Sequence, residues 1–202
     1  MENIKIKRGE SVIDIGAGSG ILSIAAAKLG GRVFATDSSK EAVVLVKNNA
    51  HRNKIRIEVS KGSYFADFKG KFDVIIANLP SEIVHPSYLK AIGAKLAKTI
   101  DGGNNGNEVL LRFLDQTKKR MHSKSRLYIT TSTTNDFYTV IKKILKNYKS
   151  ELLSFKAVPT KEFIRDNIKY YRKLVDEGKI IIFKRKGVWH EFAFLWELSL
   201  LK

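Results

Sequence analysis

Short apolar runs alternate with longer amphipathic stretches over the first three quarters of the chain. Continuous apolar runs are typical of buried parallel strands, and apolar positions three and four apart indicate helices. The pattern predicts strands over 11–15, 32–36, 55–59, 72–77 and 126–131, and helices over 19–29, 40–52, 86–99, 107–121 and 136–149. This alternation predicts an α/β fold with a mostly parallel sheet and helices on both faces.

The last quarter of the chain follows this pattern less regularly. It predicts a sixth strand over 151–158, a helix over 161–177, a strand-like segment over 179–184 and a seventh strand within the apolar tail 188–200. No repeat, long linker or low-complexity tract divides the 202 residues. We therefore expect one domain over 1–202, with a core over about 11–150 and C-terminal strands with a helical insert over 151–202.

Three glycines at alternate positions follow the first predicted strand. Gly16, Gly18 and Gly20 come directly after an apolar run that contains Asp14, and a helix is expected next. A strand, a glycine-rich turn and a helix together hold a nucleoside cofactor against the backbone. The dinucleotide fingerprint Gly-x-Gly-x-x-Gly needs a glycine where this chain has Ile21. The turn by itself leaves open a Rossmann domain for NAD or another nucleotide, or a glycine loop without a ligand.

An acidic side chain ends the second predicted strand. Asp37 follows the residues 32–36, where a doubly wound sheet brings a carboxylate to the two hydroxyls of a ribose. The alternative is that Asp37, with Ser38 and Ser39, only caps the next helix. Both roles can hold together, and neither separates NAD from other nucleosides.

The fourth predicted strand ends in Asn78, Leu79 and Pro80, at the carboxyl edge of the sheet where ligands bind. The Asn78 side-chain oxygen and the Leu79 carbonyl can accept the N–H protons of a planar nitrogen, and Pro80 stiffens the backbone there. Asn and Pro also end strands without any further role, which is the structural alternative.

Two of these segments are similar to the motifs of a known family. Residues 14–20, Asp-Ile-Gly-Ala-Gly-Ser-Gly, resemble motif I of the class I S-adenosylmethionine (SAM) methyltransferases, and residues 78–80 resemble their motif IV. The resemblance implies a Rossmann-like, seven-stranded sheet, SAM as methyl donor and S-adenosylhomocysteine as product. It implies that Asn78, Leu79 and Pro80 orient a planar nitrogen for methylation. The cofactor contacts that it implies are Asp14, Gly16, Ala17, Gly18, Gly20, Asp37, Ser38, Gly62, Ser63 and Asn78.

The chain departs from the family at two positions. Ser81 stands where motif IV ends in an aromatic residue, which weakens the case for a flipped and stacked base. Ser63 stands where relatives often carry an aspartate that contacts the adenine amine of SAM. Either change could reduce activity, so a non-catalytic module that binds SAM or RNA is one alternative to an enzyme.

Two further segments resemble one branch of the family. Residues 101–106, Asp-Gly-Gly-Asn-Asn-Gly, and 49–53, Asn-Ala-His-Arg-Asn, are similar to segments of HemK-type glutamine methyltransferases. This resemblance implies that the acceptor is the glutamine amide of a translation factor or of another protein. The alternative for 101–106 is a flexible, glycine-rich entry into a helix.

The position of motif I bears on how the acceptor is recognised. The apolar run that leads into it begins at residue 12, so we expect this chain to lack the N-terminal recognition domain of bacterial HemK enzymes. Archaeal and eukaryotic relatives similarly lack that domain and commonly rely on a small zinc-binding activator that pairs with the sheet edge. The residues 55–59 alternate apolar and polar side chains as an edge strand does, so they are the expected place for such a partner.

The composition indicates one kind of partner and excludes several kinds of chemistry. Lys and Arg number 37 against 20 Asp and Glu, and the formal net charge of +17 indicates a polyanionic partner such as RNA. A methyltransferase acting on rRNA or tRNA bases is therefore an alternative, although such a charge also serves solubility. The absence of cysteine excludes disulfides, thiol catalysis and thiolate metal sites.

Histidine spacing and hydropathy bear on metals, membranes and location. The four histidines are not spaced as a metal pair, so no metal is expected. No segment reaches membrane-spanning length and the charged N-terminus lacks a signal region, so we expect a cytoplasmic protein without membrane contact. The aromatic residues between 189 and 196 are expected in the core or on a sheet face, with a stacking platform for bases as the alternative.

Overall fold

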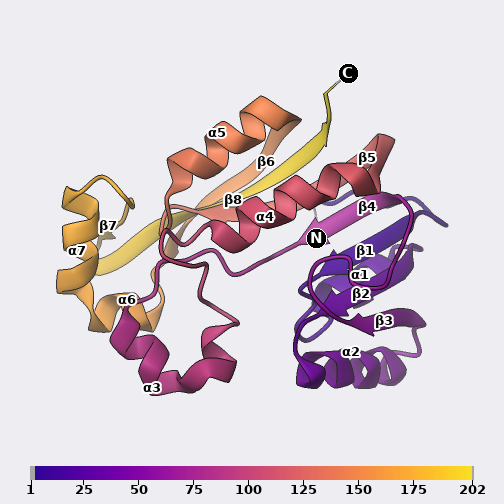
Figure 1. Ribbon diagram of the computed structural model, residues 1–202, viewed down its shortest axis with the longest axis horizontal. Coiled ribbons are helices and arrows are strands. Elements are labelled where there is room, and N and C mark those ends of the chain that lie inside the picture. The colour runs from indigo at the N-terminus through magenta and orange to yellow at the C-terminus, as the bar shows by residue number, and fades with distance from the viewer. Residues whose placement is uncertain (1–2, 202) are drawn as a thin grey trace.

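One mixed sheet runs through the computed structural model, which describes residues 3–201 (Figure 1). Its strands are β1 (Ser11–Ile15), β2 (Arg32–Asp37), β3 (Ile57–Lys61), β4 (Phe72–Ala77), β5 (Met121–Ser132), β6 (Tyr148–Pro159), β7 (Phe183–Arg185) and β8 (Val188–Leu200). The strand order is β3-β2-β1-β4-β5-β8-β6, and β7 pairs with the start of β8. β8 runs antiparallel to β5 and β6, whereas β3, β2, β1, β4 and β5 pair in parallel. The predicted Rossmann-like α/β fold is confirmed, with β7 as an additional short strand.

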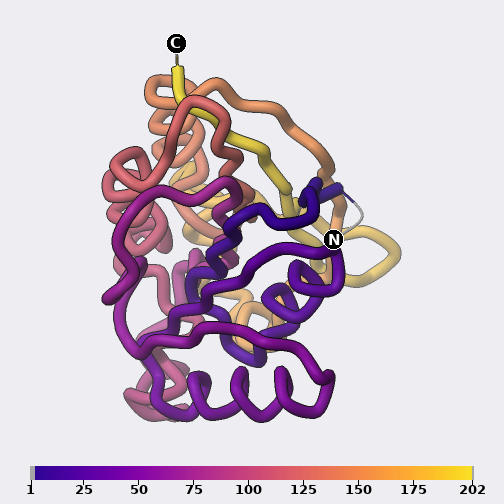
Figure 2. The backbone as a smooth tube through the Cα atoms, turned by 90° about the vertical axis from the view of Figure 1, so that its right-hand side faces the viewer, coloured from indigo at the N-terminus to yellow at the C-terminus, as the bar shows by residue number. Residues whose placement is uncertain are grey.

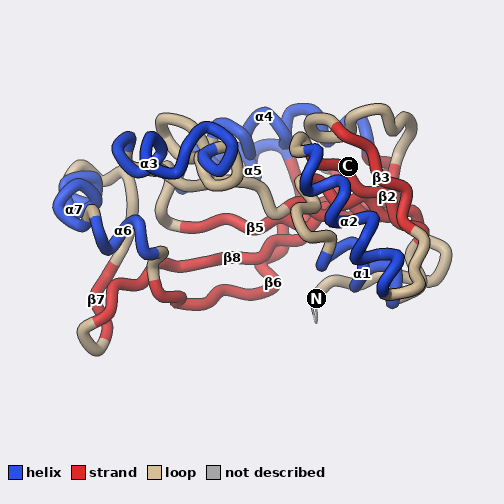
Figure 3. The backbone as a smooth tube through the Cα atoms, turned by 90° about the horizontal axis from the view of Figure 1, so that it is seen from below, coloured by secondary structure: helices blue, strands red, loops and turns tan. Residues whose placement is uncertain are grey.

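Helices pack on this sheet from two sides. They are α1 (Ile21–Lys28), α2 (Lys40–Arg52), α3 (Pro86–Ala97), α4 (Glu108–Thr117), α5 (Phe137–Asn147), α6 (Glu162–Asp166) and α7 (Ile168–Asp176), and a 3-10 turn spans Lys118–Arg120. Figure 3 shows α4 and α5 along one side of β5, β8 and β6. Viewed from the β3 end, the N-terminal half of the chain lies in front and the C-terminal strands lie behind it (Figure 2).

The central strands β1 and β4 are mostly apolar because both of their faces are covered. Val12 and Val74 share an apolar cluster with Ala26 of α1 on one face. On the other face, Ile13 shares a larger cluster with Phe113 of α4. Neighbouring residues of one strand point to opposite faces, so a strand buried on both sides has no polar alternation.

Most predicted boundaries of the first three quarters agree with the structure, and the differences have local causes. β1, β4 and α2 match their predicted ranges. β3 begins at Ile57, two positions later than predicted, and α1 begins only after Gly20, which is left-handed. α3 is interrupted at Gly93, where φ is +78°. The helix predicted to reach 121 ends at Thr117, and β5 already begins at Met121 rather than at 126.

The C-terminal quarter needs three corrections. The helix predicted over 136–149 ends at Asn147, and Tyr148 opens β6 with its buried hydroxyl donating to the Leu114 carbonyl. The single helix predicted over 161–177 is two helices separated at Asn167. Of the strand-like segment 179–184, only the residues from Phe183 onward pair with β8. Tertiary contacts decide these points, because local apolar spacing does not mark where a helix ends or where strand pairing begins.

The insert between β6 and β8 packs against the residues that follow motif IV. Phe163 and Ile164 of α6 lie in one apolar cluster with Ile83. The hydroxyl of Tyr171 in α7 donates to the Ile83 carbonyl at 3.0 Å and accepts from the His85 N–H at 3.2 Å. The insert therefore fixes the backbone that leaves the carboxyl end of β4.

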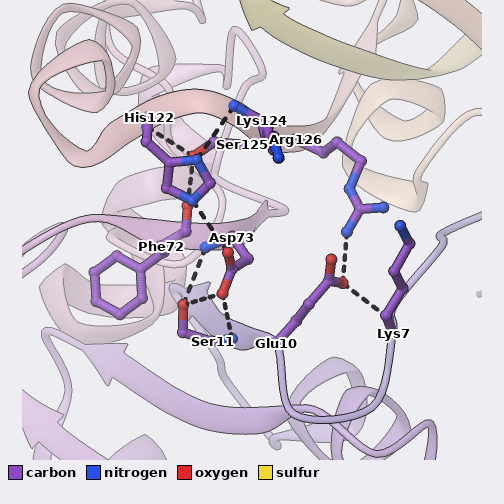
Figure 4. A network of polar contacts seen from close by, with 9 residues as sticks. All are labelled: Lys7, Glu10, Ser11, Phe72, Asp73, His122, Lys124, Ser125 and Arg126. Atoms are coloured by element: carbon purple, nitrogen blue, oxygen red, sulfur yellow. Dashed lines mark hydrogen bonds and ion pairs between the residues drawn. The ribbon is translucent and has the colours of Figure 1, made fainter.

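A polar network joins the starts of three strands at the opposite, amino edge of the sheet (Figure 4). Ser11 Oγ donates to Asp73 Oδ2 at 2.7 Å, and His122 Nε2 lies 3.1 Å from Asp73 Oδ1. Arg126 Nη2 lies 2.6 Å from Glu10 Oε2. β1, β4 and β5 are neighbours that pair in parallel, so their carboxyl ends lie side by side at the other edge.

Candidate functional site

The glycine turn lies at the carboxyl ends of the central strands. Ile15, the last residue of β1, is opposite Thr36 of β2 and Ala77 of β4. The N–H groups of Gly16 and Ala17 donate to the Thr36 carbonyl at 2.9 and 3.0 Å. The turn therefore starts between the ends of the two neighbouring strands.

All three motif glycines are required by their backbone conformation. Their φ angles are +71° at Gly16, +55° at Gly18 and +79° at Gly20, a region that residues with a Cβ rarely adopt. A Cβ on Gly16 would lie 3.0 Å from Leu79 Cδ2, and a Cβ on Gly20 would lie 3.1 Å from Val46 Cγ1. The turn thus packs against motif IV at Gly16 and against α2 at Gly20, where no side chain stands between the backbones. This arrangement fits a nucleoside held against backbone, as in SAM sites.

Asp37 supports the turn and the next helix at the same time. Its Oδ2 accepts from the Gly18 N–H and its Oδ1 from the Ser39 N–H, each at 2.9 Å. Ser39 is the N-cap of α2, because its Oγ accepts from the Ala42 N–H. A carboxylate oxygen has more than one acceptor direction, so both oxygens can still bind ribose hydroxyls. The adjacent Ser38 is exposed.

Asp14 lies beneath the turn. It is 1% exposed and accepts from Ser23 Oγ of α1 at 2.5 Å. Burial raises the pKa of Asp14 to about 6. The side chain therefore joins β1 to α1, and its contact with the ammonium of SAM stays a prediction.

The segment after β3 lies beside Asp37. Gly62 N–H donates to the Asp37 carbonyl at 2.9 Å. Ser63 is exposed and lines a cavity of about 590 Å³ together with Asp115, Lys119 and other residues near the end of α4. An adenine contact of Ser63 stays a prediction as well.

Asn78 is exposed at the end of β4, and its amide is oriented by a neighbour that the sequence did not single out. Thr130 Oγ1 of β5 donates to Asn78 Oδ1 at 2.6 Å. A carbonyl oxygen has two lone pairs, so Oδ1 retains one acceptor direction for a substrate N–H. Thr130 reaches Asn78 because β4 and β5 are adjacent and parallel.

A cavity of about 300 Å³ opens beside Asn78, Leu79 and Pro80. Its walls come from motif IV, the end of α3, β5, β8 and the start of the insert. Leu79 lines this cavity and also lies against Gly16, so the cavity adjoins the glycine turn. Three charged residues of the wall were missed from the sequence: Glu82, Lys161 and Glu191. The signal available for Glu191 is its place in the aromatic and apolar run 188–196, whereas nothing local marks Glu82.

The glycine-rich segment 101–106 forms part of the backbone behind this cavity. Gly102 N–H donates to the Glu82 carbonyl at 3.1 Å, and Asp101 pairs with Glu82 in an isolated bridge. A Cβ on Gly102 would lie 2.1 Å from the Gly106 carbonyl oxygen, and a Cβ on Gly106 would lie 2.6 Å from the Ile83 nitrogen. The glycines are therefore required by close backbone packing, which the flexible-entry alternative does not explain.

Comparison with known proteins agrees with this geometry. The family model of ribosomal protein L11 methyltransferase (PrmA) matches residues 1–94. A Methanocaldococcus jannaschii protein, a proposed protein N5-glutamine methyltransferase, is 31% identical over 166 residues, covering 81% of this chain and 83% of the relative. The chain belongs to the class I SAM-dependent methyltransferases. The Methanocaldococcus jannaschii relative fits the HemK-type resemblance. The likeness to L11 methyltransferases was not predicted.

This methyltransferase is similar to the L11 enzymes over only part of their length. The Lactobacillus helveticus ribosomal protein L11 methyltransferase is 46% identical over 86 residues, which are 42% of this chain and 27% of the relative. The solved structure of a ribosomal protein L11 methylase from Lactobacillus delbrueckii subsp. bulgaricus aligns with a TM-score of 0.57 at 22% identity, covering all of this chain and 74% of that one. The structural likeness supports the fold.

Residues 3–201 bear on whether the protein can hold a metal ion or cross a membrane. Within that range, no group of three or more His, Cys, Asp or Glu side chains is placed to hold a metal ion. No helix of the same range is long and apolar enough to cross a bilayer.

Proposed function

We propose that this chain methylates a planar nitrogen of a protein, a glutamine side-chain amide, with SAM as the methyl donor. The observation that supports the proposal most is the convergence of the glycine turn and Asn78-Leu79-Pro80 at one edge of the sheet, joined by the contact between Gly16 and Leu79. The relative named as a proposed protein N5-glutamine methyltransferase supports the acceptor.

The residues proposed to hold the cofactor are those of the turn and of the two neighbouring strand ends. The backbone of Gly16–Gly20 would face the methionine part and the ribose, and Asp37 would accept from the ribose hydroxyls. Gly62 and Ser63 would lie near the adenine. When bound, SAM supplies a methyl carbon attached to a positively charged sulfur, which a nitrogen lone pair can displace.

Asn78 and Leu79 would act on the acceptor. An amide nitrogen has a delocalised lone pair, so it has to be turned to present that pair to the methyl group. Asn78 Oδ1 and the Leu79 carbonyl can accept its two N–H protons, and Thr130 holds the Asn78 amide in place. Pro80 restricts the backbone on the far side of that carbonyl.

An exocyclic amine of an RNA base is the second candidate acceptor. The net charge of +17 favours a polyanionic partner. Ser81 in place of an aromatic residue disfavours a stacked base at this position.

A small zinc-binding activator at the free edge of the sheet is part of the same proposal. β3 stands at the end of the strand order, which is where an added strand could pair. Equal SAM affinity and activity with and without any co-purified partner would contradict this part. A cytoplasmic location likewise stays a prediction.

Two measurements test the proposed function. Methyl transfer from labelled SAM into an extract, followed by protease or nuclease digestion, should place the label on protein. Label lost only to nuclease would assign the acceptor to RNA. In the second measurement, Asp37→Ala should weaken SAM binding in calorimetry at least about tenfold, since the lost hydrogen bonds involve a charge. Glu58→Ala, an exposed acid on β3, serves as the control.

A further inference from the structure

Two carboxylates are buried in the wall of the cavity beside motif IV. Glu82 is 6% exposed and Glu191 is 5% exposed, although charged side chains are seldom buried without partners. The Oε2 atom of each is shielded from solvent and has no hydrogen-bond partner among residues 3–201. An unpaired buried acceptor destabilises a protein. Two such acceptors in one cavity therefore indicate a ligand that donates hydrogen bonds to them.

One lysine compensates only half of this charge. Lys161 Nζ lies 2.5 Å from Glu82 Oε1, and Lys161 is itself half exposed at the start of the insert. Glu191 has no cation within ion-pair distance among the described residues. When both carboxyls are ionised, the three side chains therefore carry one net negative charge.

The backbone holds Glu82 at a fixed place relative to Asn78. Glu82 follows Asn78 by four positions in the sequence, and both line the same cavity. The Glu82 carbonyl accepts from Gly102, and the next residue, Ile83, donates to the Thr134 carbonyl at 3.0 Å. Glu191 reaches the cavity from β8, on the far side of β5 from Asn78.

We propose that Glu82 and Glu191, balanced by Lys161, form a subsite that binds a guanidinium or ammonium side chain of the protein acceptor beside the nitrogen that is methylated. This inference rests on the proposed function for its place next to the acceptor nitrogen. It adds a specificity that motif IV does not carry, namely a basic residue close to the methylated one.

A cation fits this subsite better than a neutral or anionic group. The ligand has to bring N–H donors to two carboxylate oxygens, which ammonium and guanidinium groups do with a compensating charge. Burial, together with the nearby Glu82, raises the pKa of Glu191 to about 7. Without a bound cation, ionisation of Glu191 beside Glu82 is therefore unfavourable. The ionisable groups that face Glu191 are Glu82 and Lys161, and a phosphate would meet both carboxylates.

The test is an NMR titration of the ¹⁵N-labelled protein with N-acetyl-arginine amide at pH 7.5. N-acetyl-citrulline amide, which has the same shape without the charge, is the matched ligand. The variants are Glu191→Gln and Ala193→Leu, the second of which fills the cavity and leaves its charges in place. Glu151→Gln, an exposed acid on β6, is the control.

We expect saturable shifts at the cavity with arginine, at least tenfold weaker binding of citrulline, and a similar loss in Glu191→Gln and in Ala193→Leu. Glu151→Gln should bind as the unaltered protein does. Equal affinity for the two ligands, or full arginine binding in both cavity variants, would overturn the proposal. SAM binding and methyl transfer are measured separately, so a failed subsite and a failed methyltransferase assignment give different results.

Discussion

The side chain of Asn78 is predicted to contact the acceptor nitrogen, and the geometry of the sheet orients it. Its oxygen is held by Thr130 of the next strand, and its exposed amide faces a cavity that begins at the same residue. Motif IV predicts Asn78, but the residue that orients it lies on another strand. The two positions together therefore test whether the amide is an acceptor for the substrate N–H.

Replacing Asn78 by alanine should lower kcat by about 10²–10³, because the substrate nitrogen loses a preorganised acceptor. SAM affinity should stay within about threefold of the original value. Thr130→Val keeps Asn78 but removes the donor that orients it, so we expect a smaller loss, about tenfold. Single-turnover transfer and calorimetry of SAM binding measure these effects. Full activity of Asn78→Ala would refute the role of motif IV.

Because Glu191 is buried, its ionisation makes the stability of the folded protein depend on pH. Its pKa in the folded protein is about 7, above the ordinary value of 4.5. The folded state therefore binds the proton more tightly, and the free energy of unfolding falls as the pH rises from about 4.5 to about 7. Glu191→Gln should be more stable than the unaltered protein at pH 8 by up to about 3 kcal/mol.

Urea unfolding at several pH values measures this difference. The gain in Glu191→Gln should shrink toward zero as the pH falls well below 4.5, because the carboxyl is then neutral in both states. Glu151→Gln should show no such trend. A difference that does not change with pH would mean that Glu191 is not a buried, raised acid.

At the scale of elements, the sequence located the early strands and helices better than the late ones. β1, β4 and α2 are predictable because each is a single buried run or an amphipathic helix with a clear cap. Tyr148 was assigned to a helix because it continues the apolar spacing of α5, but it opens β6. Its hydroxyl bond to Leu114 depends on a contact that no local pattern contains.

The glycine-rich segment 101–106 gives a test at this scale. Gly106 and Gly178 share a φ of +69°, but only Gly106 is crowded, since a Cβ there would lie 2.6 Å from the Ile83 nitrogen. Gly178→Ala should cost about 1 kcal/mol of stability through backbone strain alone. Gly106→Ala should cost at least about 2 kcal/mol more, because the backbone beside Glu82 has to move. Equal losses in denaturant unfolding would contradict the packing role.

At the scale of the whole molecule, the β7–β8 hairpin lies away from the glycine turn and carries a cluster of positive charge. Residues 184–186, Lys-Arg-Lys, are exposed at the tip of that hairpin, at the end of the molecule opposite α2 (Figure 1). The single-domain division and the RNA contact are predictions that neither the fold nor the comparisons test. The charge is a property of the surface, so its partner has to be found by binding.

If the surface contacts RNA, changing residues 184–186 to serine should weaken binding of a single-stranded 20-mer and reduce the slope of log K against log salt by about 2. Serines at Lys40, Lys47 and Arg52 of α2 remove the same charge elsewhere and serve as the control. Fluorescence anisotropy at several salt concentrations measures both. Identical effects of the two triple variants would assign the binding to net charge alone.

The α/β class, the family and the glycine turn can be predicted from the amino-acid sequence alone, since they depend on local features. Apolar runs, helical spacing and the positive φ that only glycine adopts easily are all properties of neighbouring residues. The surroundings of motif IV, in contrast, follow from the tertiary structure. It brought Thr130 to Asn78, the insert to the segment after Pro80, and Glu191 to Glu82 and Lys161. Those residues lie far apart in the chain, and their contacts arise from strand order and the packing of the insert, which no single segment encodes.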